Sequence, residues 1–252
     1  MFKGELTLSR ARGAKAQRRL AHNQLPVENT INFNQAVKSH RHVEIIPKSR
    51  GQEQLVLDLR NPNNAISIVS GPAGTGKTYL IMLSAIKALK TGQIDKLILT
   101  RPAVEVDEEK HGFLPGDLNS KMEPWTRPLL DILKEFYTPR DIAKMLEDGV
   151  IEISPLAFMR GRTFRNAWVI ADEMQNATPS QMKMLLTRIG EGSKIVVNGD
   201  VEQTDRKANN NGLLDIISKL KSKNIRGLST CVLSAKDIQR HPIIGDLLTL
   251  YT

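Results

Sequence analysis

The most informative part of the sequence is a glycine-rich stretch, Gly71-Pro72-Ala73-Gly74-Thr75-Gly76-Lys77-Thr78. The residues just before it, 65–70, are β-prone and mostly apolar, and residues 79–89 after it carry apolar side chains at helical spacing. Glycines allow backbone N–H groups to close around an anion, and the amino end of the following helix adds the positive end of its dipole. The stretch therefore predicts a phosphate-binding loop between a strand and a helix.

The residue types of this loop predict a site for ATP and Mg²⁺. We expect Lys77 to bridge the β- and γ-phosphates and the Thr78 hydroxyl to bind Mg²⁺. The predicted nucleotide-binding residues are those of the loop and the next residue of the helix: Gly71, Pro72, Ala73, Gly74, Thr75, Gly76, Lys77, Thr78 and Tyr79.

Two further apolar runs end in polar residues. Residues 167–173 end in Asp172-Glu173, and residues 194–200 end in Asn-Gly-Asp and lead to Gln203. We expect Asp172 to organise the Mg²⁺ shell, Glu173 to orient the attacking water and Gln203 to sense the γ-phosphate or the water. The alternatives are a surface acidic pair after a core strand and an ordinary polar turn.

The other apolar segments indicate the fold class. Strands are expected at 96–100, 150–153 and 230–234, and helices at 127–136, 139–147, 179–189 and 212–220. Alternating strands and helices predict a three-layer α/β P-loop NTPase fold with a mostly parallel sheet. The single cysteine, Cys231, lies in an apolar run and excludes both an intramolecular disulfide framework and a cysteine-based zinc site.

The charge of the chain is unevenly distributed. Of the net charge of +9 over 252 residues, residues 1–50 contribute +7, from 10 basic and 3 acidic side chains. We predict a basic, partly flexible N-terminal extension over 1–45 and an ATPase domain over 46–252; the extension is either a nucleic-acid-binding arm, a solubilising tail or a transit peptide. No apolar run reaches the length of a membrane span and no apolar leader begins the chain, so we expect a cytoplasmic protein without membrane association.

Several motifs occur together in one order. GPAGTGKT (71–78), TRPAVE (100–105), GFLPGD (112–117), LAFMRGRTFRNAWVIADEMQNAT (156–178), QMKMLLTRIG (181–190) and NGDVEQTD (198–205) follow one another along the chain. This set resembles the PhoH-like ATPases, whose core is similar to the first motor domain of superfamily 1 helicases. One departure is that Thr204-Asp205-Arg206 follows Gln203, where the family often has an apolar-Asp-Leu-Pro continuation.

The resemblance implies a RecA-like fold, Mg²⁺-dependent ATP hydrolysis and a homo-oligomeric ring, expected to be a hexamer. By the same resemblance Gln52 sits where superfamily 1 proteins have an adenine-reading glutamine; an ordinary surface glutamine is the alternative. The chain has no room for a second motor domain, so we expect a neighbouring subunit to supply an arginine to the site. Arg240 is the first candidate and Arg188 the second, and the cluster Arg160, Arg162 and Arg165 is a third; a solvated surface arginine is the alternative for each.

These expectations combine into one leading function and two alternatives. The leading hypothesis is an oligomeric ATPase coupled to RNA or single-stranded DNA, as in a helicase or translocase. In the long connection 101–125, Arg101 is placed to touch a nucleic-acid phosphate, and Phe113 and Trp125 either stack on bases or pack against the body. The alternatives are an ATP-dependent assembly switch without unwinding activity and a small-molecule P-loop kinase.

Overall fold

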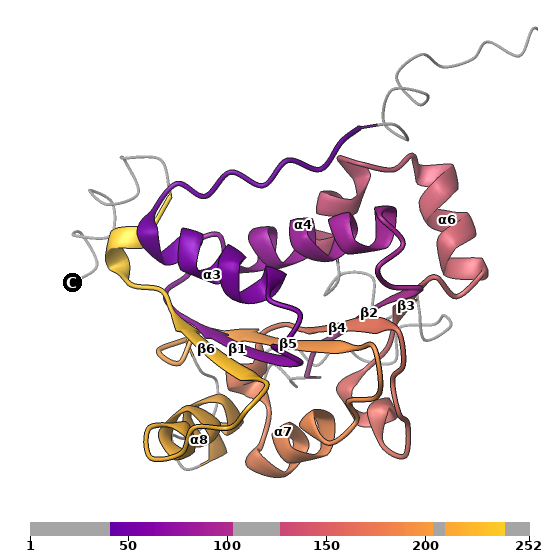
Figure 1. The fold of residues 1–252 in the computed structure, drawn as a ribbon. Coiled ribbons are helices and arrows are strands. Elements are labelled where there is room, and N and C mark those ends of the chain that lie inside the picture. The colour runs from indigo at the N-terminus through magenta and orange to yellow at the C-terminus, as the bar shows by residue number, and fades with distance from the viewer. Residues whose placement is uncertain (1–40, 103–126, 204–209, 240–252) are drawn as a thin grey trace, which may run out of the picture. The chain divides into compact units, whose positions relative to one another are not determined.

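The computed structural model describes residues 41–102, 127–203 and 210–239. Within these residues six strands form one sheet in the order β3-β2-β4-β5-β1-β6, and every neighbouring pair is parallel (Figure 1). The strands are β1 (Ile66–Ser70), β2 (Lys96–Thr100), β3 (Ile151–Ile153), β4 (Ala167–Ala171), β5 (Lys194–Gly199) and β6 (Leu228–Val232). The predicted α/β fold with a mostly parallel sheet is confirmed.

Helices cover both faces of the sheet. Helices α3 and α4 lie on one face, and α7 and α8 lie on the other (Figure 1). The α-helices are α3 (Arg50–Arg60), α4 (Lys77–Lys90), α6 (Pro139–Glu147), α7 (Pro179–Leu186) and α8 (Gly212–Leu220), with a further helical stretch over 127–134. Short 3₁₀ helices are η1 (Leu156–Met159), η2 (Met174–Asn176) and η4 (Ala235–Asp237). No helix in the described part of the chain is long and apolar enough to cross a membrane.

Because helices cover both faces of the sheet, the central strands are mainly apolar on both faces. Successive residues of a strand point to opposite faces, so a strand buried on both sides has no polar alternation. In β5, Val196 belongs to the core under α3 and α4, whereas Ile195 and Val197 belong to the core with α7 and α8. All six residues of β5 are buried, and the same holds for the five residues of β4.

The strand register brings the polar ends of three strands together. Strand β5 lies between β1 and β4, with Ser70 opposite Gly199 and Ala171 opposite Val197. Asp172 therefore follows β4 at the level of Asn198, beside the loop that leaves β1. Ligands of open α/β sheets bind at this carboxyl edge of the strands.

The first described helix was absent from the sequence expectations. Helix α3 begins after Ser49, whose hydroxyl accepts a hydrogen bond from the Gln52 N–H, and it buries Leu55, Val56 and Leu59. A serine cap followed by apolar residues at helical spacing is a readable signal for this helix. Val43 and Ile45, which precede it, are also buried in the core. The expected division at residue 45 remains a prediction, and the expected features at 103–125 and the departure from the family pattern at 204–206 lie outside the described residues.

A cluster of charged side chains connects β3 to β2 and to the segment that follows η1. The Glu152 carboxylate on β3 pairs with Lys96 of β2 at 2.7 Å and accepts hydrogen bonds from both terminal nitrogens of Arg162, the Nη2 bond being 2.9 Å. The hydrogen bond from Arg162 lowers the pKa of Glu152 most, burial opposes it, Lys96 lowers it further, and the resulting pKa is about 2. Arg162, a member of the arginine cluster considered above, is thus engaged within its own chain.

We predict that Glu152→Gln lowers the thermal stability of the protein at neutral pH. Charge-assisted hydrogen bonds contribute roughly 1–3 kcal/mol, which corresponds to a fall of several degrees in Tm for a chain of this size. Because the folded pKa is depressed, this contribution is complete above pH 4.5 and is lost as the pH falls toward 2. Thermal unfolding at pH 7 and pH 3 measures it, and an equal Tm difference at both pH values contradicts the assignment.

Candidate nucleotide-binding site

The loop between β1 and α4 has the backbone geometry that an anion cradle requires. Gly76 caps α4 with φ 77° and Gly74 has φ 84°, in the left-handed region that favours glycine. Lys77 is the first residue of α4, and its ammonium group donates hydrogen bonds to the carbonyl oxygens of Gly71 at 2.6 Å and Pro72 at 2.8 Å. The Lys77 side chain therefore lies against the loop that is expected to bind the phosphates.

Two side chains from distant elements brace the loop. The Asp200 carboxylate, which follows β5, accepts a hydrogen bond from the Ala73 N–H at 3.1 Å. The buried Gln52 side chain of α3 donates to the Thr75 carbonyl at 3.0 Å and accepts from the Lys48 N–H at 2.7 Å. Gln52 therefore supports the loop from beneath. The Gln52 amide still has one N–H and one oxygen lone pair available for a ligand. Its adenine-reading role remains a prediction.

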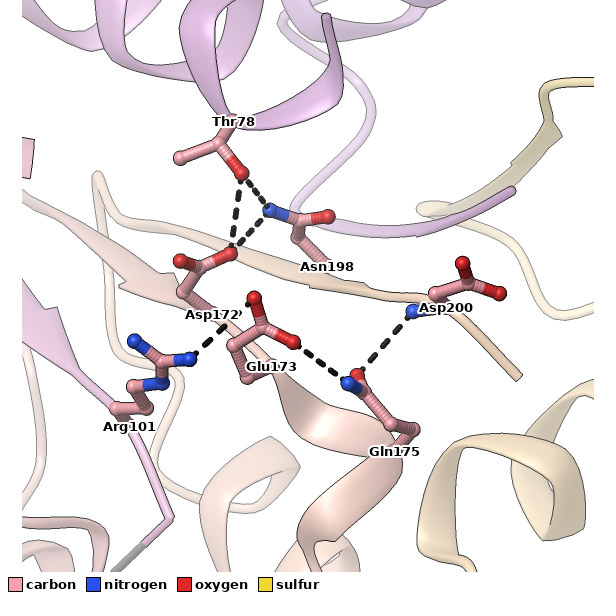
Figure 2. A network of polar contacts seen from close by, with 7 residues as sticks. All are labelled: Thr78, Arg101, Asp172, Glu173, Gln175, Asn198 and Asp200. Carbon is pink, nitrogen blue, oxygen red and sulfur yellow. Dashed lines mark hydrogen bonds and ion pairs between the residues drawn. The ribbon is translucent and has the colours of Figure 1, made fainter. Parts of the chain in front are cut away.

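Asp172, Thr78 and Asn198 form a compact oxygen-rich cluster at the end of the loop (Figure 2). The Thr78 hydroxyl lies 3.2 Å from the Asp172 carboxylate, and the Asn198 amide nitrogen donates to both, at 2.8 Å to Thr78. The side-chain oxygen of Asn198 is buried and has no hydrogen-bond partner among the described residues. A buried acceptor without a partner is costly, and it points to a missing donor or cation.

Burial, together with the negative charge of Glu173, raises the pKa of Asp172 to about 6. Arg101 and the hydrogen bond from Thr78 act in the opposite direction. A carboxylate in this environment is stabilised by a cation, and the hydroxyl of Thr78 and the carboxylate of Asp172 provide the hard oxygen ligands that Mg²⁺ prefers. No cluster of three or more His, Cys, Asp or Glu occurs among the described residues.

Glu173 is held in an unusual backbone conformation beside this cluster. Its φ of 53° and ψ of 38° are left-handed, which is uncommon for a residue with a side chain and occurs most often at functional sites. Gln175 donates to one carboxylate oxygen at 2.6 Å, and Arg101 pairs with the other at 3.4 Å (Figure 2). The side-chain oxygen of Gln175 also accepts from the Asp200 N–H at 3.2 Å.

Most of the predicted loop residues, both acidic residues and Gln203 line one cavity of about 280 Å³, whereas Gly71, Pro72, Thr75 and Gln52 do not line it. Its lining includes residues of the loop, both acidic residues and the expected sensor: Ala73, Gly74, Gly76, Lys77, Thr78, Tyr79, Asp172, Glu173, Asn198, Gly199, Asp200 and Gln203. The structure thus brings the loop, the acidic pair and Gln203 together. Their individual roles remain predictions.

Arg188 does not line this cavity. The Arg188 guanidinium donates to the carbonyls of Met184 at 3.1 Å and Arg162 at 3.3 Å and to the Thr187 hydroxyl at 3.0 Å, so it closes the end of α7 within its own chain. Arg240 lies outside the described residues. A contribution of either arginine to another subunit stays a prediction.

Sequence reasoning missed Gln175 and Asn198. Gln175 stands two residues after the acidic pair, and Asn198 stands two residues before Asp200. Both are nearly fully buried although polar, and only the fold shows what compensates them. A polar residue inside an otherwise apolar strand is the signal that singles out Asn198.

A glycine-rich loop at a helix amino end, facing an Asp-Glu pair at the carboxyl edge of a parallel sheet, defines a P-loop NTPase fold. The family profile described as "PhoH-like protein" matches residues 44–252. The chain belongs to this PhoH-like family.

The chain is similar in sequence to proteins of three bacteria that are named PhoH-like protein or Protein PhoH. The chain is 44% identical to a PhoH-like protein of Synechocystis sp. over 85% of this chain and 64% of the relative, and 44% identical to one of Bacillus subtilis over 91% and 70%. It is 39% identical to Protein PhoH of Escherichia coli over 74% and 55%. The chain thus spans roughly three fifths of the length of several of these relatives.

Solved structures show a weaker likeness. The helicase domain of Pyrococcus furiosus Hef aligns with a TM-score of 0.43 at 11% identity over 74% of this chain and 38% of that chain. Pif1 helicase from Candida albicans aligns with a TM-score of 0.40 at 18% identity over 81% and 44%. At this similarity neither alignment carries an argument about function.

We predict that Gln175→Glu lowers kcat of the expected ATP hydrolysis about tenfold or more, with a much smaller change in KM for ATP. The substitution removes the donor to Glu173 and places a second negative charge beside it, whereas the loop that binds the phosphates is untouched. Steady-state kinetics measure both constants, and exposed Gln93→Glu is the matched control. A normal kcat in folded Gln175→Glu contradicts a positioning role.

Proposed function

We propose that this protein hydrolyses ATP with Mg²⁺ and couples hydrolysis to RNA or single-stranded DNA. The observation that carries the first part is the placement of the Glu173 carboxylate on the same cavity as Lys77, Thr78 and Asp172. A carboxylate there is suited to orient a water molecule toward the γ-phosphate. A small-molecule kinase instead needs an acceptor group at that position, so the acidic residue favours hydrolysis.

The residues divide the work among them. The loop N–H groups and the amino end of α4 bind the phosphates, and Lys77 exchanges its carbonyl partners for phosphate oxygens. Thr78 and Asp172 would hold Mg²⁺, which supplies charge neutralisation on the phosphates. Glu173 orients the water, and Gln203 responds to the presence of the γ-phosphate.

We predict that Glu173→Gln retains ATP binding but lowers kcat about 100-fold or more. The amide keeps the size of the side chain and loses the proton-accepting carboxylate. Lys77→Ala is the contrasting variant and weakens binding itself, because it removes a charge that contacts the phosphates. Fluorescent ATP-analogue binding and phosphate release measure the two effects. Normal turnover in Glu173→Gln contradicts the role of Glu173.

The second part of the proposal, nucleic-acid coupling in a ring, draws on the family relationship and the charge distribution. The basic residues 1–50 favour contact with a phosphate backbone. We further propose a homo-oligomer in which Arg240, or as the second candidate Arg188, acts on a neighbouring subunit's nucleotide, and a cytoplasmic location for the assembly. An ATP-dependent assembly switch is the competing function.

The deciding experiment measures ATP hydrolysis with and without RNA, single-stranded DNA and duplex, at low and high salt. We predict stimulation by a single strand that weakens with salt, since phosphate contacts release counterions. Light scattering on the same preparations reports the oligomeric state, for which we expect a hexamer. A rate that no nucleic acid changes supports the assembly switch instead, and an active monomer contradicts the arginine contribution between subunits.

A further inference from the structure

The pairing of Arg101 with Glu173 joins the expected catalytic residue to a residue that does not line the nucleotide cavity. Arg101 directly follows β2, and its guanidinium lies 3.4 Å from one Glu173 oxygen. Glu173 lines the cavity of the phosphate loop, whereas Arg101 does not. The arginine therefore reaches the glutamate from outside the nucleotide site, on the side opposite Gln175 (Figure 2).

The pair is weak enough to be exchanged. The side chains of Arg101 and Glu173 are 28% and 37% exposed, and ion pairs at this exposure contribute little because water and salt screen them. Arginine binds phosphate through two parallel hydrogen bonds, so a phosphate group competes well for it. A buried pair would be held by the cost of leaving one charge without a partner.

The surface next to Arg101 has the composition of a single-strand binding site. The Arg101 carbonyl accepts a hydrogen bond from the N–H of Leu156 at 3.4 Å, which ties it to the start of η1. The same short helix carries Phe158, which is 56% exposed, and is followed by the exposed Arg160. An exposed aromatic ring on a short helix that is bonded to the Arg101 backbone and followed by a second arginine offers a stacking surface for a base together with charges for the backbone.

Glu173 is restrained from both sides in the present arrangement. Gln175 and Arg101 each hold one carboxylate oxygen, and the backbone of Glu173 is left-handed. Each carboxylate oxygen can accept a second hydrogen bond, but the two contacts together fix the orientation of the carboxylate, so the release of one contact allows it to turn toward the attacking water. The Arg101 contact is the longer and the more exposed of the two, so it is the one that yields.

We propose that Arg101 restrains Glu173 until a single-stranded nucleic acid, bound across Arg101, Phe158 and Arg160, draws the arginine onto a backbone phosphate. This rests on the proposed function and adds the binding surface and the route by which binding stimulates hydrolysis. Arg101 is a positioning residue in this scheme, because it acts on the reaction through Glu173.

The test compares the full-length protein with Arg101→Gln, Arg101→Lys and the control Arg140→Gln, which changes an exposed arginine at the start of α6. ATP turnover is measured without nucleic acid and with saturating oligouridylate. We expect Arg101→Gln to raise the RNA-free kcat roughly two- to fivefold and to lose most of the further stimulation. Arg101→Lys keeps a charge beside Glu173, so its RNA-free kcat stays near that of wild type. Arg140→Gln behaves as wild type in both conditions.

A binding measurement tests the surface separately. Fluorescence anisotropy with a labelled oligouridylate reports affinity without turnover, and loss of base stacking in Phe158→Ala lowers the affinity about fivefold or more. Arg160→Gln lowers the affinity and its salt dependence, whereas Arg140→Gln changes neither.

The outcomes separate this inference from the proposed function. If RNA stimulates the wild type and Arg101→Gln shows an unchanged or lower RNA-free rate with full stimulation, the restraint by Arg101 is wrong. If Phe158→Ala and Arg160→Gln bind as wild type, the surface is wrong. If no nucleic acid stimulates the wild type, the coupling in the proposed function fails, and a raised rate in Arg101→Gln then rejects nucleic acid as the ligand that releases the glutamate.

Discussion

The buried carboxylate of Asp172 is the constraint on which the rest of the site depends. Its side chain is 7% exposed, and a buried charge must be compensated or neutralised. The compensation comes from separate parts of the chain, because Thr78 belongs to α4 and Asn198 to β5. The parallel register of β1, β5 and β4 is what brings these side chains within hydrogen-bonding distance. The compensation of the Asp172 charge therefore depends on the order of the strands in the sheet.

The same carboxyl edge connects the phosphate loop to the residues after β5. The Asp200 carboxylate accepts a hydrogen bond from the Ala73 N–H. The Asp200 N–H donates to the side-chain oxygen of Gln175, and the Gln175 amide nitrogen donates to the Glu173 carboxylate. The phosphate loop and the glutamate are thus connected through two hydrogen-bonded side chains. Gln203, three residues after Asp200, lines the same cavity.

Local patterns predicted the parts of the site that are contiguous in sequence. The loop over 71–78 is recognisable because glycine spacing, the lysine and the flanking strand and helix all fall within one short stretch. The strands are recognisable because burial on both faces makes the central ones mainly apolar. The roles of Asn198 and Gln175 depend on which strand neighbours which, and no local pattern contains that information. Helix α3, by contrast, was predictable from local sequence, because it has a serine cap and apolar residues at helical spacing.

The contrast between the two contacts of Glu173 explains why the strand order matters for control as well as for binding. Gln175 is 2% exposed and fixed by a second bond to the chain after β5, so its contact persists. Arg101 stands at the end of β2, next to β4 in the sheet, where solvent reaches its side chain. A site with only buried partners would hold Glu173 in one arrangement whether or not another molecule were present. One buried and one exposed partner give the same glutamate a stable position and a contact that an outside anion can change.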